Sequence, residues 1–179
     1  MKRNRQNSSG GFTIVELLVA MGILTAGILG TGAMVLIGMG RNNANRVDTT
    51  ATNASQAVIE ALASPSANTN ASFNMTDCLN TDPSTSPLTV NTAAGGAPLT
   101  AGGDIDYSQA AVAGYQINYT VCGTNGQQTV YDVRWNVAAI GTKGFGKLIT
   151  VSARQPFLAS IHGINGSLVP ATLRTVVGI

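Results

Sequence analysis

The stretch Gly10-Gly11-Phe12-Thr13-Ile14-Val15-Glu16 opens an apolar segment that continues to Met39. After Glu16, residues 17–39 form a run of 23 positions without a charged side chain. A helix of that length spans roughly 35 Å at about 1.5 Å per residue, enough to cross a hydrocarbon core of about 30 Å. The segment therefore predicts a membrane-spanning helix with one carboxylate at its start.

Basic residues are concentrated ahead of this helix. Lys2, Arg3 and Arg5 predict a cytoplasmic N-terminus by the positive-inside rule, and Arg41 and Arg46 on the far flank oppose it only weakly. The net charge is +2, and beyond the three leading basic residues seven basic side chains face eight acidic ones. That balance predicts no nucleic-acid partner. With 10% charged and 44% apolar residues, the composition favours a membrane-embedded or polymeric protein over a free cytosolic enzyme.

An ordinary secretory signal peptide is the main alternative for this segment. Such peptides have an apolar region of about 7–15 residues that ends near a cleavage site of the small-x-small type. Here the apolar run is longer, and the nearest clear Ala-x-Ala pattern, Ala61-Leu62-Ala63, lies beyond a polar stretch. The sequence thus favours a helix that is retained in the mature protein.

Small residues recur along the apolar helix. Gly22, Ala26 and Gly30 are four positions apart and would share one helix face. Such rows let two helices approach closely in lipid. The alternative is that glycine is simply more frequent in membrane helices than in soluble ones.

Glu16 is the most unusual residue of the segment. A carboxylate in a membrane-spanning stretch costs a few kcal/mol by the lower published scales and usually has a partner. If the chain were cut after Gly11, Phe12 would carry an α-amino cation four residues before Glu16, in reach of a pair within or between subunits. The alternative is that Glu16 lies at the membrane interface and reaches water.

The pattern becomes amphipathic at Arg41 and stays so to residue 63. The residues predicted to share the apolar face are Val47, Ala51, Ala54, Val58, Ala61 and Leu62. No proline interrupts residues 12–63, so one long helix is expected, ending at Ser64-Pro65 because proline lacks the helical donor. Residues 64–114 are rich in Ser, Thr, Asn, Gly and Pro, and they predict a long connection with at most short strands.

Alternating patterns typical of strands begin at Tyr115. The apolar face is predicted to consist of Tyr115, Ile117, Tyr119 and Val121, then Tyr131, Val133, Trp135 and Val137, then Ile149, Val151 and Ala153. Asn125-Gly126 indicates a hairpin turn, and the tail around Leu173–Val177 predicts an edge strand beside Pro170. We therefore expect an α+β fold in which the amphipathic half of the helix covers an antiparallel sheet of three to four strands.

The segment Gly11-Phe12-Thr13-Ile14-Val15-Glu16-Leu17-Leu18-Val19-Ala20 resembles the class III signal of type IV pilins and pseudopilins. Those signals have a basic leader ending in Gly, then Phe, then Glu at the fifth mature position, then about twenty apolar residues. The resemblance implies cleavage between Gly11 and Phe12 by prepilin peptidase and N-methylation of Phe12. It also implies that Glu16 sets the register of an incoming subunit, and that the fold is the ladle of pilins.

The stretch Ile23–Gly30 resembles the PilV type of minor pilin more narrowly, as do Tyr131–Trp135 and Leu148–Val151 with less specificity. The membrane helix also lacks the internal proline of many major pilins, which argues against a major subunit. The resemblance implies other pilin subunits, prepilin peptidase, an inner-membrane assembly platform and membrane lipid as partners. Its alternatives are a type II secretion pseudopilin and a membrane-anchored adhesin that binds through residues 64–114.

This interpretation divides the chain into five parts: a cleaved leader (1–11), a transmembrane and assembly helix (12–40), its amphipathic continuation (41–63), a polar loop region (64–114), and a sheet with a C-terminal tail (115–179). The expected location is the bacterial inner membrane, in a single pass with the C-terminal domain in the periplasm, and later the fibre at the cell surface.

Cys78 and Cys122 would then lie outside the cytoplasm, where disulfides persist. A bridge would close a loop of 45 residues, worth ~4 kcal/mol in the chain-entropy model. Two free thiols or a disulfide to a partner are the alternatives. Metal binding is disfavoured because neither cysteine has a His or a second Cys at ligand spacing.

No enzymatic motif accompanies these features. His162 has neither a placed nucleophile nor an orienting carboxylate, so no catalytic residue is predicted. The pair Asp104 and Asp106 is better explained as solvated loop polarity than as a cation site, and Trp135 with Tyr131 as sheet core. No cofactor and no metal are expected.

Overall fold

The computed structural model describes residues 11–64, 70–82, 88–123, 126–141, 146–156 and 169–178. Its elements are α1 (Ile14–Ala63), β1 (Ser72–Met75), β2 (Leu88–Asn91), β3 (Gly95–Gly96), β4 (Gln116–Cys122), β5 (Gln128–Ile140), β6 (Gly146–Arg154) and β7 (Ala171–Gly178). The chain divides between Asn43 and Ala44 into two compact units. The first part of α1 belongs to one unit, and the rest of α1 and all strands belong to the other. His162 lies outside the described residues.

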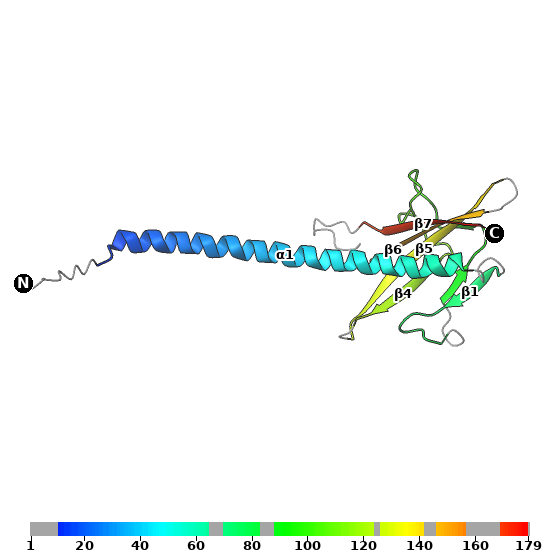
Figure 1. The fold of residues 1–179 in the computed structure, drawn as a ribbon, viewed down its shortest axis with the longest axis horizontal. Coiled ribbons are helices and arrows are strands. Elements are labelled where there is room, and N and C mark those ends of the chain that lie inside the picture. The colour runs from blue at the N-terminus through cyan, green and yellow to red at the C-terminus, as the bar shows by residue number, and fades with distance from the viewer. Residues whose placement is uncertain are drawn as a thin grey trace, which may run out of the picture. The chain divides into compact units, whose positions relative to one another are not determined.

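The strands of the second unit form two antiparallel sheets (Figure 1). The larger has five strands in the order β3-β5-β6-β7, with β4 also paired to β5. β3 and β4 follow one another along the same edge of β5, since Gly96 pairs with Asn136 and Gln116 with Arg134. The smaller sheet joins β1 to β2, with Phe73 opposite Val90.

The core of this unit lies between the end of α1 and the five-stranded sheet (Figure 1). The helix contributes small and branched side chains at the spacing of one helix face, namely Ala51, Ala54, Val58, Ile59 and Leu62. Ser55 is also fully buried there, and its hydroxyl donates to the carbonyl oxygen of Ala171 at 3.0 Å. The predicted α+β fold, with a long N-terminal helix packed on an antiparallel sheet, is confirmed.

Trp135 forms the centre of the sheet side of this core. It is completely buried, and its indole Nε1 donates to the Asn91 carbonyl oxygen at 2.9 Å, which satisfies its one polar atom. Gly96 adopts φ +130° directly beside it. A Cβ at Gly96 would overlap the Trp135 carbonyl oxygen and lie 2.8 Å from the Asn136 Cα, so the close approach of β3 to β5 requires glycine.

The region 64–114 contains more regular structure than a plain loop. It contributes β1, β2 and β3, and an isolated antiparallel bridge joins Leu99 to Ile105. Thr100 N donates to the Asp104 carbonyl oxygen at 2.8 Å, which closes the turn between the two sides of that bridge. The segment that follows packs on the sheet face opposite the helix, so both faces of the sheet are covered in part.

Candidate processing and assembly site

Helix α1 begins at Ile14 because Thr13 caps it. The Thr13 hydroxyl oxygen accepts a hydrogen bond from Glu16 N at 3.3 Å, and the Thr13 carbonyl oxygen accepts one from Leu17 N at 3.1 Å. Thr13 and Glu16 stand three residues apart, in the Thr-x-x-Glu arrangement of a capping box. The residues before the cap, Gly11 to Thr13, are not helical.

The position of Glu16 in the first helical turn lowers the cost of its charge. The unpaired N–H groups at a helix N-terminus create a partial positive charge that favours a nearby carboxylate. Across the described residues, no side chain binds the Glu16 carboxylate, and Phe12 is 85% exposed. The structure places Phe12 and Glu16 on either side of the cap, and a partner for the carboxylate must come from outside this part of the chain.

The peptide bond between Gly11 and Phe12 lies in the exposed, non-helical segment before the cap. A Cβ built on Gly11 would meet no atom within 4 Å. Packing among the described residues therefore does not explain a glycine at this position. The geometry leaves the bond open to a protease.

The row of Gly22, Ala26 and Gly30 faces open space. Its members are four residues apart and lie on one face of α1, and a Cβ on Gly22 or Gly30 would again meet nothing within 4 Å. The structure gives these small residues no partner among the residues it describes, so any close packing along this row requires another molecule.

The hydroxyl groups of the apolar helix are satisfied within it. Thr25 Oγ1 donates to the carbonyl oxygens of Met21 and Gly22 at 3.0 and 2.9 Å. Thr31 Oγ1 donates in the same way to those of Gly27 and Ile28 at 3.0 and 3.1 Å. Such internal bonds let polar side chains enter a bilayer without an unpaired donor. The apolar part of α1 is not buried within the described structure, and by its length and composition the helix could cross a membrane.

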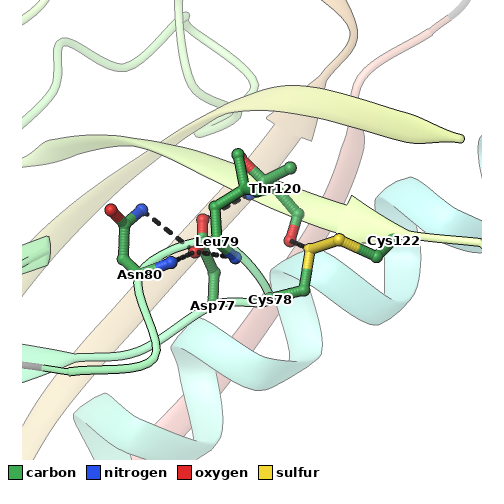
Figure 2. The surroundings of a disulfide bond; sticks show 6 residues. All are labelled: Asp77, Cys78, Leu79, Asn80, Thr120 and Cys122. Carbon is green, nitrogen blue, oxygen red and sulfur yellow. Dashed lines mark hydrogen bonds between the residues drawn. A yellow bond between two sulfur atoms is a disulfide. The ribbon is translucent and has the colours of Figure 1, made fainter. Parts of the chain in front are cut away.

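A disulfide joins Cys78 to Cys122 at the end of β4, with 5.9 Å between the two Cα atoms (Figure 2). Both residues are exposed. The intramolecular pairing that was expected is confirmed, and the alternatives of free thiols and a partner disulfide are wrong.

Asp77, next to this disulfide, fastens the same segment to β4 (Figure 2). One carboxylate oxygen accepts from Thr120 N at 2.8 Å, and the other accepts from Leu79 N at 2.9 Å and Asn80 N at 2.6 Å. Burial acts to raise the pKa of Asp77, but the N–H donors of Asn80, Thr120 and Leu79 together hold it below the ordinary value of 3.8.

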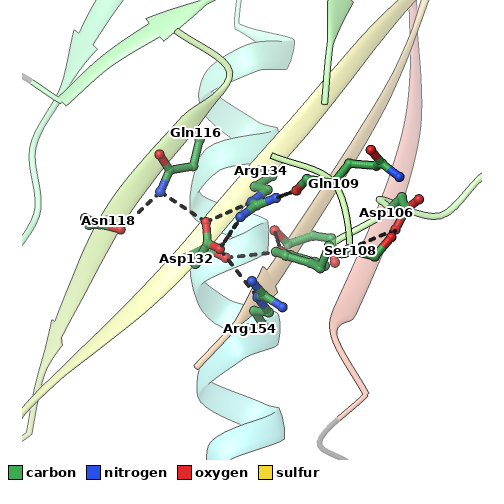
Figure 3. Close-up of polar contacts among 10 residues, drawn as sticks. Asp106, Ser108, Gln109, Gln116, Asn118, Asp132, Arg134 and Arg154 are labelled. Carbon is green, nitrogen blue, oxygen red and sulfur yellow. Dashed lines mark hydrogen bonds and ion pairs between the residues drawn. The ribbon is translucent and has the colours of Figure 1, made fainter. Parts of the chain in front are cut away.

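A buried ionic cluster covers the sheet face opposite the helix (Figure 3). The Asp132 carboxylate contacts Arg134 Nη2 at 3.0 Å and Arg154 Nε at 3.4 Å. Both guanidinium groups also stack on the Tyr107 ring, at 4.8 and 4.2 Å from its centroid. Arg134 further donates to the Gln109 carbonyl oxygen at 2.9 Å, so the cluster holds the segment around Tyr107 against the sheet.

The Tyr107 hydroxyl completes the cluster. It lies 2.7 Å from the Ser152 carbonyl oxygen and 3.1 Å from that of Asp132, and it donates its proton between them. Burial raises the pKa of Tyr107, so the hydroxyl remains a donor at neutral pH. The charged side chains of Asp132, Arg134 and Arg154 thus stabilise the packing of the segment around Tyr107 against the sheet.

The described residues contain no group of three or more His, Cys, Asp or Glu side chains placed to hold a metal. Asp104 pairs with Arg174 at 2.8 Å, and Asp106 accepts hydrogen bonds from the amide and hydroxyl of Ser108 at 2.9 and 2.6 Å. The two carboxylates thus bind different partners and do not converge on one point.

Sequence reasoning missed three residues that organise these sites. The Thr13 cap was readable from the Thr-x-x-Glu spacing. From the sequence, Asp77 could be predicted only to form a local turn, because its hydrogen bond with Thr120 N joins residues 43 positions apart. Tyr107 lies in a polar segment without periodicity, so no sequence signal placed it beneath two arginines.

Residues 6–32 match the family model described as the prokaryotic N-terminal methylation motif. The match includes Gly11, Phe12, Glu16 and the row of small residues. No curated protein and no solved structure matches the chain. The motif, a class III signal peptide, supports a prepilin of the type IV pilin or pseudopilin kind, which is a membrane-anchored structural subunit that prepilin peptidase processes and that assembles with other pilins.

Proposed function

We propose that the chain is a minor pilin of the PilV type, a subunit of a type IV pilus that supports fibre assembly, adhesion or motility, and not an enzyme. The observation that carries the proposal is the methylation motif at the capped start of an exposed apolar helix whose other half packs on an antiparallel sheet. The stretch Ile23–Gly30 supports the narrower assignment to the PilV type.

In this proposal, prepilin peptidase cuts after Gly11 on the cytoplasmic side and the new amine of Phe12 is methylated. The open, non-helical segment before Thr13 supports this step, because a protease binds extended chain more readily than helix. The apolar part of α1 then holds the subunit in the inner membrane. The unit that begins at Ala44, called the sheet domain below, lies in the periplasm.

Assembly transfers the exposed apolar helix from lipid into a bundle of helices. Lateral packing replaces lipid contacts, and the row of Gly22, Ala26 and Gly30 lets a neighbouring helix approach closely. Glu16 binds the Phe12 amine of its own or an adjacent subunit there. Such a pair, buried in the bundle, fixes the register of the incoming subunit more than it adds stability.

The test compares two substitutions of Glu16 in cells that lack the wild-type gene. Glu16→Ala removes the whole carboxylate side chain, whereas Glu16→Gln removes only the charge and keeps a side chain of nearly the same shape. We expect both variants to be processed normally and both to be lost from sheared fibres. Normal incorporation of Glu16→Gln would show that the charge has no role in assembly.

Type II secretion pseudopilins carry the same motif. Deleting the gene tests whether the subunit belongs to a type IV pilus or to a type II secretion system. Loss of surface fibres with normal export of hydrolases is the expected result. Loss of exported hydrolases with intact fibres would assign the subunit to the secretion system instead.

A further inference from the structure

The segment that follows β1 is joined to β4 by two separate links (Figure 2). The first is the disulfide between Cys78 and Cys122. The second is the Asp77 carboxylate, which accepts a hydrogen bond from Thr120 N at 2.8 Å. β1 itself pairs with β2 in the smaller sheet, so the ladder of the larger sheet does not hold the residues that follow it. A covalent and a noncovalent link therefore join the same two segments.

The backbone of Thr120 contacts both Asp77 and Cys78. Its N–H donates to the Asp77 carboxylate, and its carbonyl oxygen lies 3.2 Å from the Sγ of Cys78. A disulfide sulfur has no proton to donate, but a reduced Cys78 thiol at this place would donate to that oxygen. Both contacts are thus open to the reduced chain, in which they hold residues 77 and 78 to β4 without the disulfide.

The Asp77 carboxylate also fixes the direction of the chain around Cys78. Its second oxygen accepts from Leu79 N at 2.9 Å and from Asn80 N at 2.6 Å, which closes a turn that contains the cysteine. Asp77 is buried, and hydrogen bonds to an ionised carboxylate are roughly twice as strong as those between neutral groups. One side chain therefore sets both the location and the orientation of Cys78.

Cys122 is two residues beyond Thr120 on β4, so their side chains lie on the same face of the strand. The Asp77–Thr120 bond thereby brings Cys78 next to its partner, with 5.9 Å between the two Cα atoms. Cysteines whose Cα atoms are more than about 7 Å apart cannot be bridged without movement of the backbone. A segment that drifted from β4 by a few ångströms would therefore fail to close the bridge.

We propose that Asp77 is a positioning residue for formation of the disulfide: its bond to Thr120 holds the reduced Cys78 beside Cys122, so that the bridge closes on a site that is already folded. The inference concerns the sheet domain and does not depend on the proposed function.

The oxidation is a thiol–disulfide exchange with a disulfide donor such as oxidised glutathione. One cysteine attacks a donor sulfur as its thiolate and releases one glutathione thiolate, which leaves a mixed disulfide. The other cysteine then attacks the protein sulfur of that mixed disulfide and releases the second glutathione thiolate. The two protein thiols lose two protons and two electrons, and the donor disulfide is reduced to two thiols. Asp77 acts on the second step, because that step requires both cysteines to be close.

The test measures the equilibrium of the full-length chain, in detergent micelles, with a buffer of reduced and oxidised glutathione. Acid quenching, alkylation of free thiols and intact mass give the bridged fraction at each ratio. Asp77→Ala should lower the equilibrium constant for closing the bridge roughly tenfold, because it removes a buried hydrogen bond to a charged group. Asp106→Ala is the matched control and should leave the constant unchanged. The Asp106 carboxylate also accepts from a backbone N–H two residues later, that of Ser108, but its segment carries neither cysteine.

Two further measurements separate positioning from general stability. Val58→Ala weakens the core at a fully buried residue of the helix and should leave the equilibrium constant unchanged while the domain stays folded, which the emission of the buried Trp135 reports. In concentrated urea, where the bond to Thr120 is lost, the wild type and Asp77→Ala should give the same constant. Asp77→Asn keeps one acceptor oxygen, which cannot serve Thr120 and the turn at once, and should cause a smaller loss.

Hydrogen exchange on the reduced wild-type chain needs no variant to fold. The Thr120 N–H should remain protected after reduction, since its bond to Asp77 does not require the disulfide. This protection, together with the loss in Asp77→Ala alone, supports the proposal. An unprotected Thr120 amide or an exposed Trp135 in the reduced wild type would overturn it. So would equal constants for Asp77→Ala and the wild type, or an equal drop in Val58→Ala.

Discussion

The helical unit that ends at Asn43 exposes its large apolar side chains, whereas the unit that follows has a core of buried ones. Leu24 is 62% exposed and Trp135 is 0% exposed, although both are apolar residues in regular elements. The difference shows that the two units depend on different partners. The sheet domain has a buried core of its own, whereas the apolar helix is suited to lipid or to other subunits.

The carboxylates of the two units differ in the same way, because several of those in the sheet domain have partners within the fold. In the sheet domain, Asp132 holds two arginines and Asp77 binds three backbone N–H groups. In the helical unit, the Glu16 carboxylate has no partner among the described residues. A charge that the fold does not use is a candidate for use in assembly.

The largest expected effect comes from the core of the sheet domain. Trp135→Ala should lower the free energy of unfolding by about 3–5 kcal/mol, because it leaves a cavity and an unbonded Asn91 carbonyl. Leu24→Ala in the apolar helix should leave that free energy unchanged. Urea unfolding of the full chain in detergent, monitored by amide hydrogen exchange in β6, measures the free energy of unfolding of both variants. An equal loss in the two variants would mean that the helix and the sheet domain are not separate.

Removing the disulfide should have the next largest effect. The double substitution Cys78→Ser and Cys122→Ser should destabilise the sheet domain by about 2–4 kcal/mol, since the loop between them is no longer closed in the unfolded chain. Both cysteines are exposed, so a reductant should reproduce the effect in the wild-type protein. Unchanged unfolding after complete reduction, verified by thiol counting, would contradict this expectation.

A smaller effect is expected at the ionic cluster. Tyr107→Phe keeps the ring beneath both arginines but removes the hydroxyl donor from the Ser152 carbonyl oxygen, which should cost about 1 kcal/mol. Tyr119→Phe is the matched control, because its hydroxyl makes no hydrogen bond within the described residues. The difference between the two variants in urea unfolding isolates the hydroxyl at residue 107.

The smallest expected effect is the change in the free energy of unfolding with pH that Asp77 causes. The pKa of Asp77 is below 3.8 in the folded state, so the folded state binds fewer protons than the unfolded state near that pH. The stabilisation from this carboxylate is complete well above pH 3.8 and is lost as the pH falls below it. Asp77→Asn should flatten the dependence between pH 5 and pH 2. Asp106→Asn should change it less, because solvent screens that exposed carboxylate.

Much of the fold could be predicted because its signals are local. The charge-free run, the helical spacing of Ala51, Ala54 and Val58, and the alternation along β5 each depend on neighbouring residues only. The cover on the second sheet face could not be predicted, because it depends on contacts such as Tyr107 with Arg154, which are distant in sequence. The position of β3 among the short strands of residues 64–114 could not be predicted for a related reason, since two glycines carry no strand propensity and pair only because Gly96 can approach Trp135 so closely.

The proposed processing site could be predicted from sequence because an enzyme, and not the fold, would recognise it. Gly11 and Phe12 have no structural role in the described chain, which is why their pattern stands out against the residues around them. Glu16 also stands three residues after the cap, and its backbone N–H donates to the Thr13 hydroxyl oxygen.

The central claim, that the start of the chain is a processing signal and that the exposed helix is retained, is tested most directly by the intact mass and N-terminal residue of the mature protein purified from membranes. The account predicts a chain that begins at Phe12 and carries one N-methyl group. An intact Met1, or a chain that begins after Ala63, would contradict it.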